Sequence, residues 1–135
     1  MRRRQLVTAV LAAAAVGPVV VARRAAATEM PRPFSQVAFA AAQAAGKPIL
    51  VDVWASWCPI CAKQAPTLAR LALDPTFREM VVLRVDFDAQ KDVVRAFGVR
   101  MQSTLIVFRG TKETGRAVGE TDPEAIRALL ATGLG

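Results

Sequence analysis

An apolar run from Ile49 to Ala55, interrupted only by Asp52, leads almost directly into two cysteines spaced two residues apart, Cys58 and Cys61. The run is nearly free of polar residues, which is typical of a central strand covered on both faces. Pro59 follows the first cysteine and suits the first turn of a helix, where its missing N–H has no partner to lose. The segment therefore predicts a buried strand, a short turn and a helix that begins at the cysteine pair.

Cysteines three positions apart in a helical turn lie on one face, close enough to form a disulfide. Cys58 would cap the helix, where free N–H groups and the positive end of the helix dipole stabilise a thiolate. Thiols placed in this way have pKa values of roughly 3.5–7.5 instead of about 8.5. We therefore expect Cys58 to be the attacking nucleophile and Cys61, one turn inside and less exposed, to resolve the mixed disulfide. Taken alone, the spacing also fits a structural disulfide or half of a metal site shared by two chains.

The rest of the composition limits the kinds of catalysis and metal binding that this chain can carry out. The chain of 135 residues has no histidine, which excludes Ser-His-Asp and Cys-His catalysis as well as histidine-ligated zinc. Two cysteines cannot supply four thiolates, so a Cys₄ metal site within one chain is excluded too. We expect no metal and no cofactor other than a redox-active disulfide. Hydrophobic residues make up 53% of the chain, enough for one packed domain.

The net charge of +7 is concentrated at the N-terminus. Residues 1–27 hold five of the 18 basic residues and no acidic one, which leaves 13 basic against 11 acidic residues in the remainder. A domain this close to neutral, without a basic stripe, argues against binding to nucleic acid.

Residues 1–27 have the organisation of an export signal. Arg2 to Arg4 form a basic start, residues 6–22 are apolar, and three alanines at 25–27 provide small residues for cleavage. The pair Arg3-Arg4 partly matches a twin-arginine export motif. We predict export to the periplasm, a compartment where disulfides persist. An uncleaved membrane anchor is the alternative, although Gly17-Pro18 interrupts the apolar stretch.

After a predicted linker at residues 28–34, the pattern predicts one domain over residues 35–135. Capping residues and apolar spacing predict helices that begin after Ser35, Cys58, Asp88 and the capping box Thr121–Glu124. Apolar runs predict strands at residues 49–55, 80–86, 104–108 and 112–118. This order predicts an α/β fold with a four-stranded mixed sheet and helices on both faces; a fifth, very short strand before the first helix is the alternative.

The chain resembles the thioredoxin family over residues 35–132. The segment Lys47 to Cys61, with the sequence KPILVDVWASWCPIC, follows the family's strand and active-site pattern, and Pro66, residues 97–100 and Gly119 match as well. The resemblance implies a thioredoxin-like fold and a thiol–disulfide oxidoreductase that acts on protein disulfides. Residues 46–48 and 74–77 look most like the C-terminal thioredoxin domain of DsbD-type reductases. We therefore expect the reducing direction and re-reduction by a membrane electron carrier of the DsbD or CcdA type.

The resemblance also implies roles for individual residues. Asp52 matches the family's buried acid beneath the second cysteine, where it would relay a proton to or from Cys61. Arg84 falls where the family often has a lysine near that acid. Contacts with substrate are expected from residues beside the cysteines and from the loop that faces them: Trp57, Pro59, Ile60, Gln102 and Ser103.

Ser103 departs from the family pattern, because it occupies the place of a cis-proline before the strand 104–108. We expect a trans peptide between Gln102 and Ser103, since a non-proline cis bond costs about 2.5–4 kcal/mol. The backbone there would still pair with an extended substrate, and the Ser103 hydroxyl would be able to hydrogen-bond a sulfur.

These observations predict an exported, monomeric thiol–disulfide oxidoreductase. Two other functions fit the residues less closely and remain open. One is a metal- or cofactor-delivery module that uses the two thiols as soft ligands. The other is a non-catalytic thioredoxin-fold adaptor whose disulfide is structural.

Overall fold

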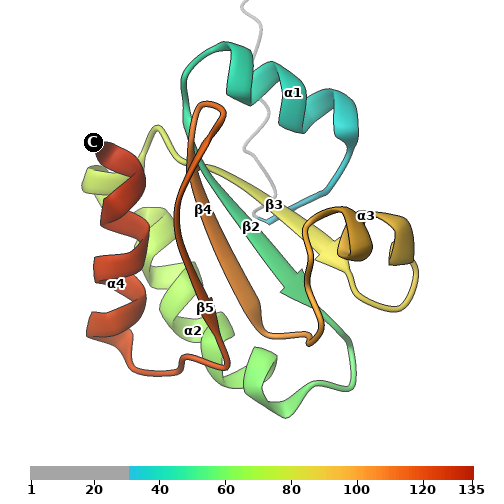
Figure 1. The fold of residues 1–135 in the computed structure, drawn as a ribbon. Coiled ribbons are helices and arrows are strands. Elements are labelled where there is room, and N and C mark those ends of the chain that lie inside the picture. Colours follow the sequence, from blue (N-terminus) through green and yellow to red (C-terminus); the bar gives the residue numbers. More distant parts are fainter. Residues whose placement is uncertain (1–30) are drawn as a thin grey trace, which may run out of the picture.

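A five-stranded mixed sheet forms the centre of the computed structural model, which describes residues 31–135 (Figure 1). The order across the sheet is β1-β3-β2-β4-β5. β2 (Pro48–Trp54) lies in the middle, parallel to β3 (Val81–Asp86) and antiparallel to β4 (Thr104–Arg109). β5 (Lys112–Val118) pairs antiparallel with β4, and β1 (Arg32–Pro33) pairs parallel with β3 at the other edge.

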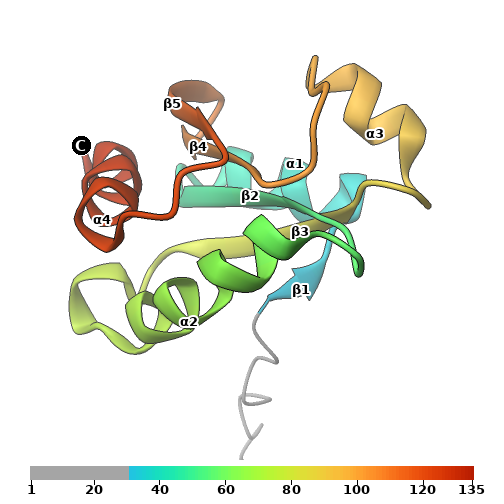
Figure 2. The ribbon, with the colours of Figure 1, turned by 90° about the horizontal axis from the view of Figure 1, so that it is seen from below.

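Four helices cover the two faces of this sheet (Figure 2). They are α1 (Gln36–Ala44), α2 (Pro59–Leu73), α3 (Lys91–Ala96) and α4 (Pro123–Ala131), with single 3₁₀ turns at Pro75–Phe77 and Thr132–Leu134. Apolar side chains of α1 and α3 pack in one core cluster, and those of α2 and α4 pack in a second cluster on the opposite face. Both clusters include residues of β2, which explains why that strand carries apolar residues on both faces.

The predicted fold class is confirmed, and of the two strand counts considered, the one with a fifth, very short strand before the first helix is correct. β1 has two residues, and both are exposed, so no apolar pattern marks it in the sequence. It falls within the predicted linker 28–34, where Phe34 is also buried against the sheet. The predicted signal at 1–27 and the first residues of the linker lie outside the described residues. Within 31–135, no helix has the length and apolar character that crossing a bilayer requires.

Two of the predicted helix caps are correct and two are shifted. Ser35 caps α1 through a hydrogen bond from Ala38 N, and Cys58 caps α2. The cap position of α3 is Gln90 and not Asp88. α4 is capped by Asp122, which accepts a hydrogen bond from Ala125 N, and not by Thr121. At α4 two capping residues, Thr121 and Asp122, follow one another, so the local pattern allows more than one start. At α3 no side chain caps the helix at Gln90, so the local pattern does not mark its start.

Candidate active site

The two cysteines lie at the N-terminus of α2, directly after the turn that follows β2. Cys58 and Cys61 form a disulfide with Cα atoms 5.3 Å apart. The backbone of Cys58 is extended, at φ −82° and ψ 110°, and its Sγ accepts a hydrogen bond from Cys61 N at 3.1 Å. Pro59 occupies the first turn of the helix. Once the disulfide is reduced, this end of the helix would stabilise a thiolate on Cys58, because free N–H groups and the helix dipole meet there.

Burial does not distinguish the two cysteines, contrary to the prediction that Cys61 is less exposed. Both are 3% exposed, because Ala55, Trp54, Ile60 and Phe87 pack around them. The difference between the sulfurs is therefore one of position in the helix: Cys58 caps α2, whereas Cys61 lies within its first turn.

Partly exposed apolar residues next to the cysteines in the sequence form a rim beside the disulfide: Trp57, Pro59 and Ile60. The Trp57 side chain is 57% exposed, and its Nε1 donates a hydrogen bond to Asp88 Oδ2 at 2.6 Å. Pro59 is exposed, and Ile60 is half-buried against the cysteines. The Asp88 carboxylate, which the sequence suggested as a helix cap, thus fixes the indole ring instead. The predicted substrate contacts of Trp57, Pro59 and Ile60 remain predictions that this placement supports.

Asp52 is a buried acid on β2, six residues before Cys58. It is 2% exposed, and its Oδ2 accepts hydrogen bonds from Arg84 Nε at 3.0 Å and Nη2 at 2.9 Å. Arg84 lies directly across from it on β3, and its guanidinium stacks over the Trp54 ring, 5.0 Å from the centroid. Burial raises the pKa of the Asp52 carboxyl above 3.8, and the charge and hydrogen bonds of Arg84 offset part of that rise. The Asp52 side chain is thus buried, as the resemblance implied, and does not point into solvent.

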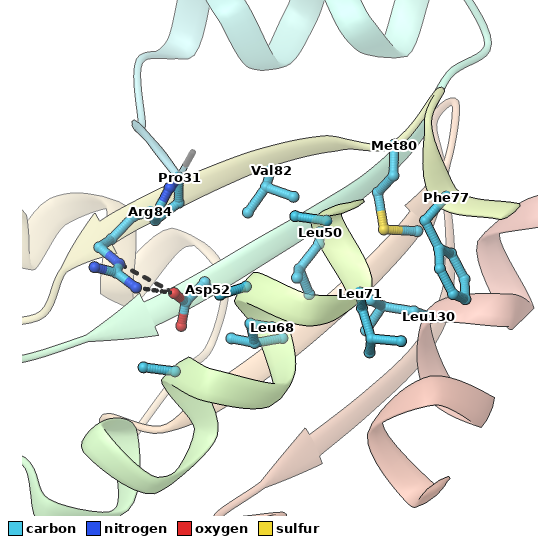
Figure 3. A pocket seen from close by; sticks show the side chains of 13 residues that line it. Pro31, Leu50, Asp52, Leu68, Leu71, Phe77, Met80, Val82, Arg84 and Leu130 are labelled. Carbon is cyan, nitrogen blue, oxygen red and sulfur yellow. Dashed lines mark hydrogen bonds and ion pairs between the residues drawn. The ribbon is translucent and has the colours of Figure 1, made fainter. Parts of the chain in front are cut away.

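A cavity of about 240 Å³ lies between α2 and the sheet, beside this ion pair (Figure 3). Its lining is apolar apart from Asp52 and Arg84 and includes Leu50, Leu68 and Val82. Ala65 also lines it, and Ala65 follows Cys61 by one helical turn on the same face of α2. The cavity therefore joins the buried carboxyl to the underside of the cysteine-bearing helix.

The loop at residues 101–103 leads into β4. It lies at the same end of the sheet as the cysteine turn, because Val53 near the end of β2 pairs with Thr104 at the start of β4. Ser103 is 3% exposed and adopts φ +63°, a left-handed conformation that non-glycine residues rarely adopt. Its N–H donates to Val53 O, and its carbonyl accepts from Gly119 N and from Gln64 Nε2. The Met101 carbonyl accepts from Thr104 Oγ1.

These hydrogen bonds change two predictions about the loop. Ser103 has no free backbone group for a substrate chain, whereas the N–H and C=O of Gln102 make no hydrogen bond to the described residues. Backbone pairing with substrate is therefore expected at Gln102 alone. The expected hydrogen bond from the Ser103 hydroxyl to a sulfur is not formed within 31–135. The trans peptide between Gln102 and Ser103 remains a prediction.

Gln64 is a part of this site that the sequence did not suggest. Its side chain is buried on α2 and donates hydrogen bonds to Ser103 O at 3.2 Å and Glu120 O at 2.9 Å. A polar residue three positions after Cys61 lies on the same buried face of the helix, and that spacing was the available signal. Within the described part of the chain, no group of three or more cysteine, aspartate or glutamate side chains is placed to hold a metal ion.

A disulfide whose first cysteine caps the helix that follows the central strand of a mixed sheet defines a thiol–disulfide oxidoreductase with a thioredoxin-like fold. The comparisons with known proteins agree. The thioredoxin family model matches residues 32–132, and the chain belongs to the thioredoxin family. It is therefore a thioredoxin-family thiol–disulfide oxidoreductase, a class that acts on protein disulfides and exchanges electrons through the cysteine pair itself.

Individual relatives show how far this similarity extends. The thioredoxin of Chlamydia muridarum is 36% identical over 97 residues, which cover 72% of this chain and 92% of that protein. The bifunctional thioredoxin reductase/thioredoxin of Mycobacterium leprae is 34% identical over 88 residues, 65% of this chain but 19% of that longer protein. The crystal structure of Trxlp from Edwardsiella tarda superposes with a TM-score of 0.72 at 45% identity, covering 73% of this chain and 96% of that one.

Proposed function

We propose that this protein is an exported reductase of disulfides in other proteins, and that it works as a monomer. The observation that carries the proposal is the position of Cys58, whose sulfur caps α2 beside the exposed rim of Trp57 and Pro59. The cysteines, Asp52 and the loop at 101–103 all come from one chain, so the proposed chemistry needs no residue from a second copy. The thioredoxins among the relatives and the sequence resemblance to DsbD-type reductase domains support the reducing direction.

The reaction begins with both cysteines reduced. The Cys58 thiolate attacks one sulfur of the substrate disulfide, so a Cys58–substrate disulfide forms and the first substrate thiolate leaves. The Asp52 carboxylate accepts the proton of the Cys61 thiol, and the resulting thiolate attacks Cys58 Sγ and releases the second substrate thiolate. The substrate gains two electrons and the protein keeps the Cys58–Cys61 disulfide. The next cycle requires two electrons from a donor, which in the periplasm would be a membrane carrier of the DsbD or CcdA type.

The direction of electron flow is tested by the reduction potential of the cysteine pair. We expect equilibration with glutathione buffers to give a value closer to that of reducing thioredoxins, about −270 mV, than to that of the oxidant DsbA, about −120 mV. The Pro59-Ile60 dipeptide is the local feature that would tune the value within this range. A potential near about −120 mV would contradict the reducing direction while leaving the oxidoreductase class intact.

Export is tested by the location of the chain in a Gram-negative host. We expect the chain with residues 1–27 to be recovered from the periplasm and a chain that starts at Thr28 to stay in the cytoplasm. Changing Arg3 and Arg4 to lysine should block export if the route is the twin-arginine one. Recovery of the complete chain in the membrane fraction would favour the anchor, and recovery in the cytoplasm would contradict export.

A further inference from the structure

The amide of Gln64 has one possible orientation in this fold. The side chain is 1% exposed, and its Nε2 lies 3.2 Å from Ser103 O and 2.9 Å from Glu120 O. Both partners are carbonyl oxygens, which accept hydrogen bonds but cannot donate them. The nitrogen, with two protons to give, must therefore face the two carbonyls, and the amide oxygen must point away from them.

The two carbonyls belong to loops that meet at the cysteine edge of the sheet. Ser103 immediately precedes β4. Glu120 is the second residue after the end of β5, directly after Gly119. Thr104 pairs with Val53 on one side and with Val118 on the other, which brings both loops beside the end of β2. Gln64 thus ties the helix that carries Cys61 to two loops far away in the sequence.

The loop at 101–103 requires hydrogen bonds from neighbouring segments to hold its conformation, because Ser103 does not restrict its own backbone as a proline would. Its φ of +63° is unfavourable for a residue with a side chain, and the conformation persists only where the surroundings impose it. Three hydrogen bonds impose it: from Ser103 N to Val53 O, from Gly119 N to Ser103 O, and from the Gln64 amide to Ser103 O.

Packing alone does not explain a glutamine at this position. Gln64 Oε1 is buried without a hydrogen-bond partner among the described residues, and an unpaired buried acceptor costs free energy. An apolar side chain of similar length would fill the same space without that cost. The contribution particular to glutamine is the pair of hydrogen bonds that its nitrogen donates.

We propose that Gln64 is a positioning residue for thiol–disulfide exchange with protein substrates, an inference that rests on the proposed function. Its amide holds the 101–103 loop so that the free N–H and C=O of Gln102 are presented for pairing with an extended substrate chain beside Cys58. A small disulfide without a peptide backbone makes no such pairing, so its reduction does not depend on Gln64.

The experiment compares two substrates across three variants. Gln64→Met keeps the length of the side chain and removes both hydrogen bonds. Gln64→Glu keeps its shape, but a carboxylate has no proton to donate to the two carbonyls. Thr67→Val is the matched control, because Thr67 is a buried polar residue one turn further along the same face of α2. Steady-state kinetics are measured with insulin and with the aromatic disulfide 5,5′-dithiobis(2-nitrobenzoate), and unfolding in urea shows whether each variant is folded.

We expect both Gln64 variants to raise KM for insulin about tenfold, because substrate binding must then order a loop that the Gln64 amide no longer holds. Their kcat/KM with the aromatic disulfide should stay within about twofold of the unsubstituted protein, and Thr67→Val should leave both substrates unaffected. Equal losses on both substrates, or an equal effect of Thr67→Val, would overturn the positioning role and leave the proposed function standing. If the unsubstituted protein does not reduce insulin at all, the proposed function fails, and this inference with it.

Discussion

Replacing Cys58 with serine is expected to abolish disulfide reduction, with a loss of at least about 10³-fold in the rate of insulin reduction. The serine hydroxyl is not ionised at neutral pH and cannot replace the thiolate that caps α2. Cys61→Ser should also stop turnover, but at a later step. Cys58 can still attack a substrate, and no second thiol then releases the mixed disulfide.

The two variants are separated by the covalent complexes that they form. Cys61→Ser should accumulate protein–substrate disulfides that non-reducing gels resolve and that mass spectrometry assigns to Cys58, whereas Cys58→Ser should form none. Because both cysteines are 3% exposed in the oxidised protein, this outcome depends on the capping position and not on accessibility. Trapping through Cys61, or insulin reduction by Cys58→Ser at the normal rate, would contradict the assigned order of attack.

The central strand and the cysteine helix could be predicted closely from the sequence. β2 spans Pro48–Trp54 against a predicted 49–55, because a strand buried on both faces is almost entirely apolar in sequence. Cys58 and Pro59 mark the start of α2 by local chemistry alone. β1 could not be found in this way, since two exposed residues carry no periodicity and their strand conformation depends on pairing with β3.

The parts of the site that were missed depend on contacts between distant segments. Gln64 reaches carbonyls 39 and 56 positions further along the chain, and nothing near it in the sequence indicates those partners. The local sequence pattern indicates that Asp88 caps a helix, yet its carboxylate accepts a hydrogen bond from the indole N–H of Trp57, 31 positions earlier. Asp52 could be predicted because the apolar strand around it implies burial, and Arg84, which the family resemblance placed near that acid, faces it and donates two hydrogen bonds to it.

Replacing Asp52 with asparagine is expected to slow protein-disulfide reduction by about 10²-fold at neutral pH, the lower end of what general base catalysis contributes. Asparagine keeps the shape of the side chain and a hydrogen-bond acceptor for Arg84, but it cannot take the proton of the Cys61 thiol. Because burial raises the Asp52 pKa, the rate for the unsubstituted protein should rise as the pH passes through that raised value and the carboxyl ionises. The asparagine variant should lack this step in its pH profile.

The same substitution should make the domain more stable at neutral pH. A carboxyl whose pKa is higher in the folded state than its unfolded value of 3.8 binds its proton more tightly when folded, so ionisation disfavours the fold. That destabilisation is absent below the unfolded value, grows as the pH rises toward the folded pKa, and is complete above it. In urea unfolding, the free energy of unfolding of Asp52→Asn relative to that of the unsubstituted protein should therefore increase as the pH is raised from acid to neutral.

Asp86→Asn provides the matched control for both measurements. Asp86 lies at the end of β3 and accepts hydrogen bonds from the N–H groups of Asp88 and Ala89, which an asparagine oxygen can also accept. It removes the same charge from the protein without touching the cavity beneath α2. If Asp52→Asn exchanges disulfides at the normal rate across neutral pH, Asp52 is not the proton relay. If it unfolds more easily than Asp86→Asn, the ion pair with Arg84 outweighs the burial of the carboxyl, and the direction of the pKa shift is wrong.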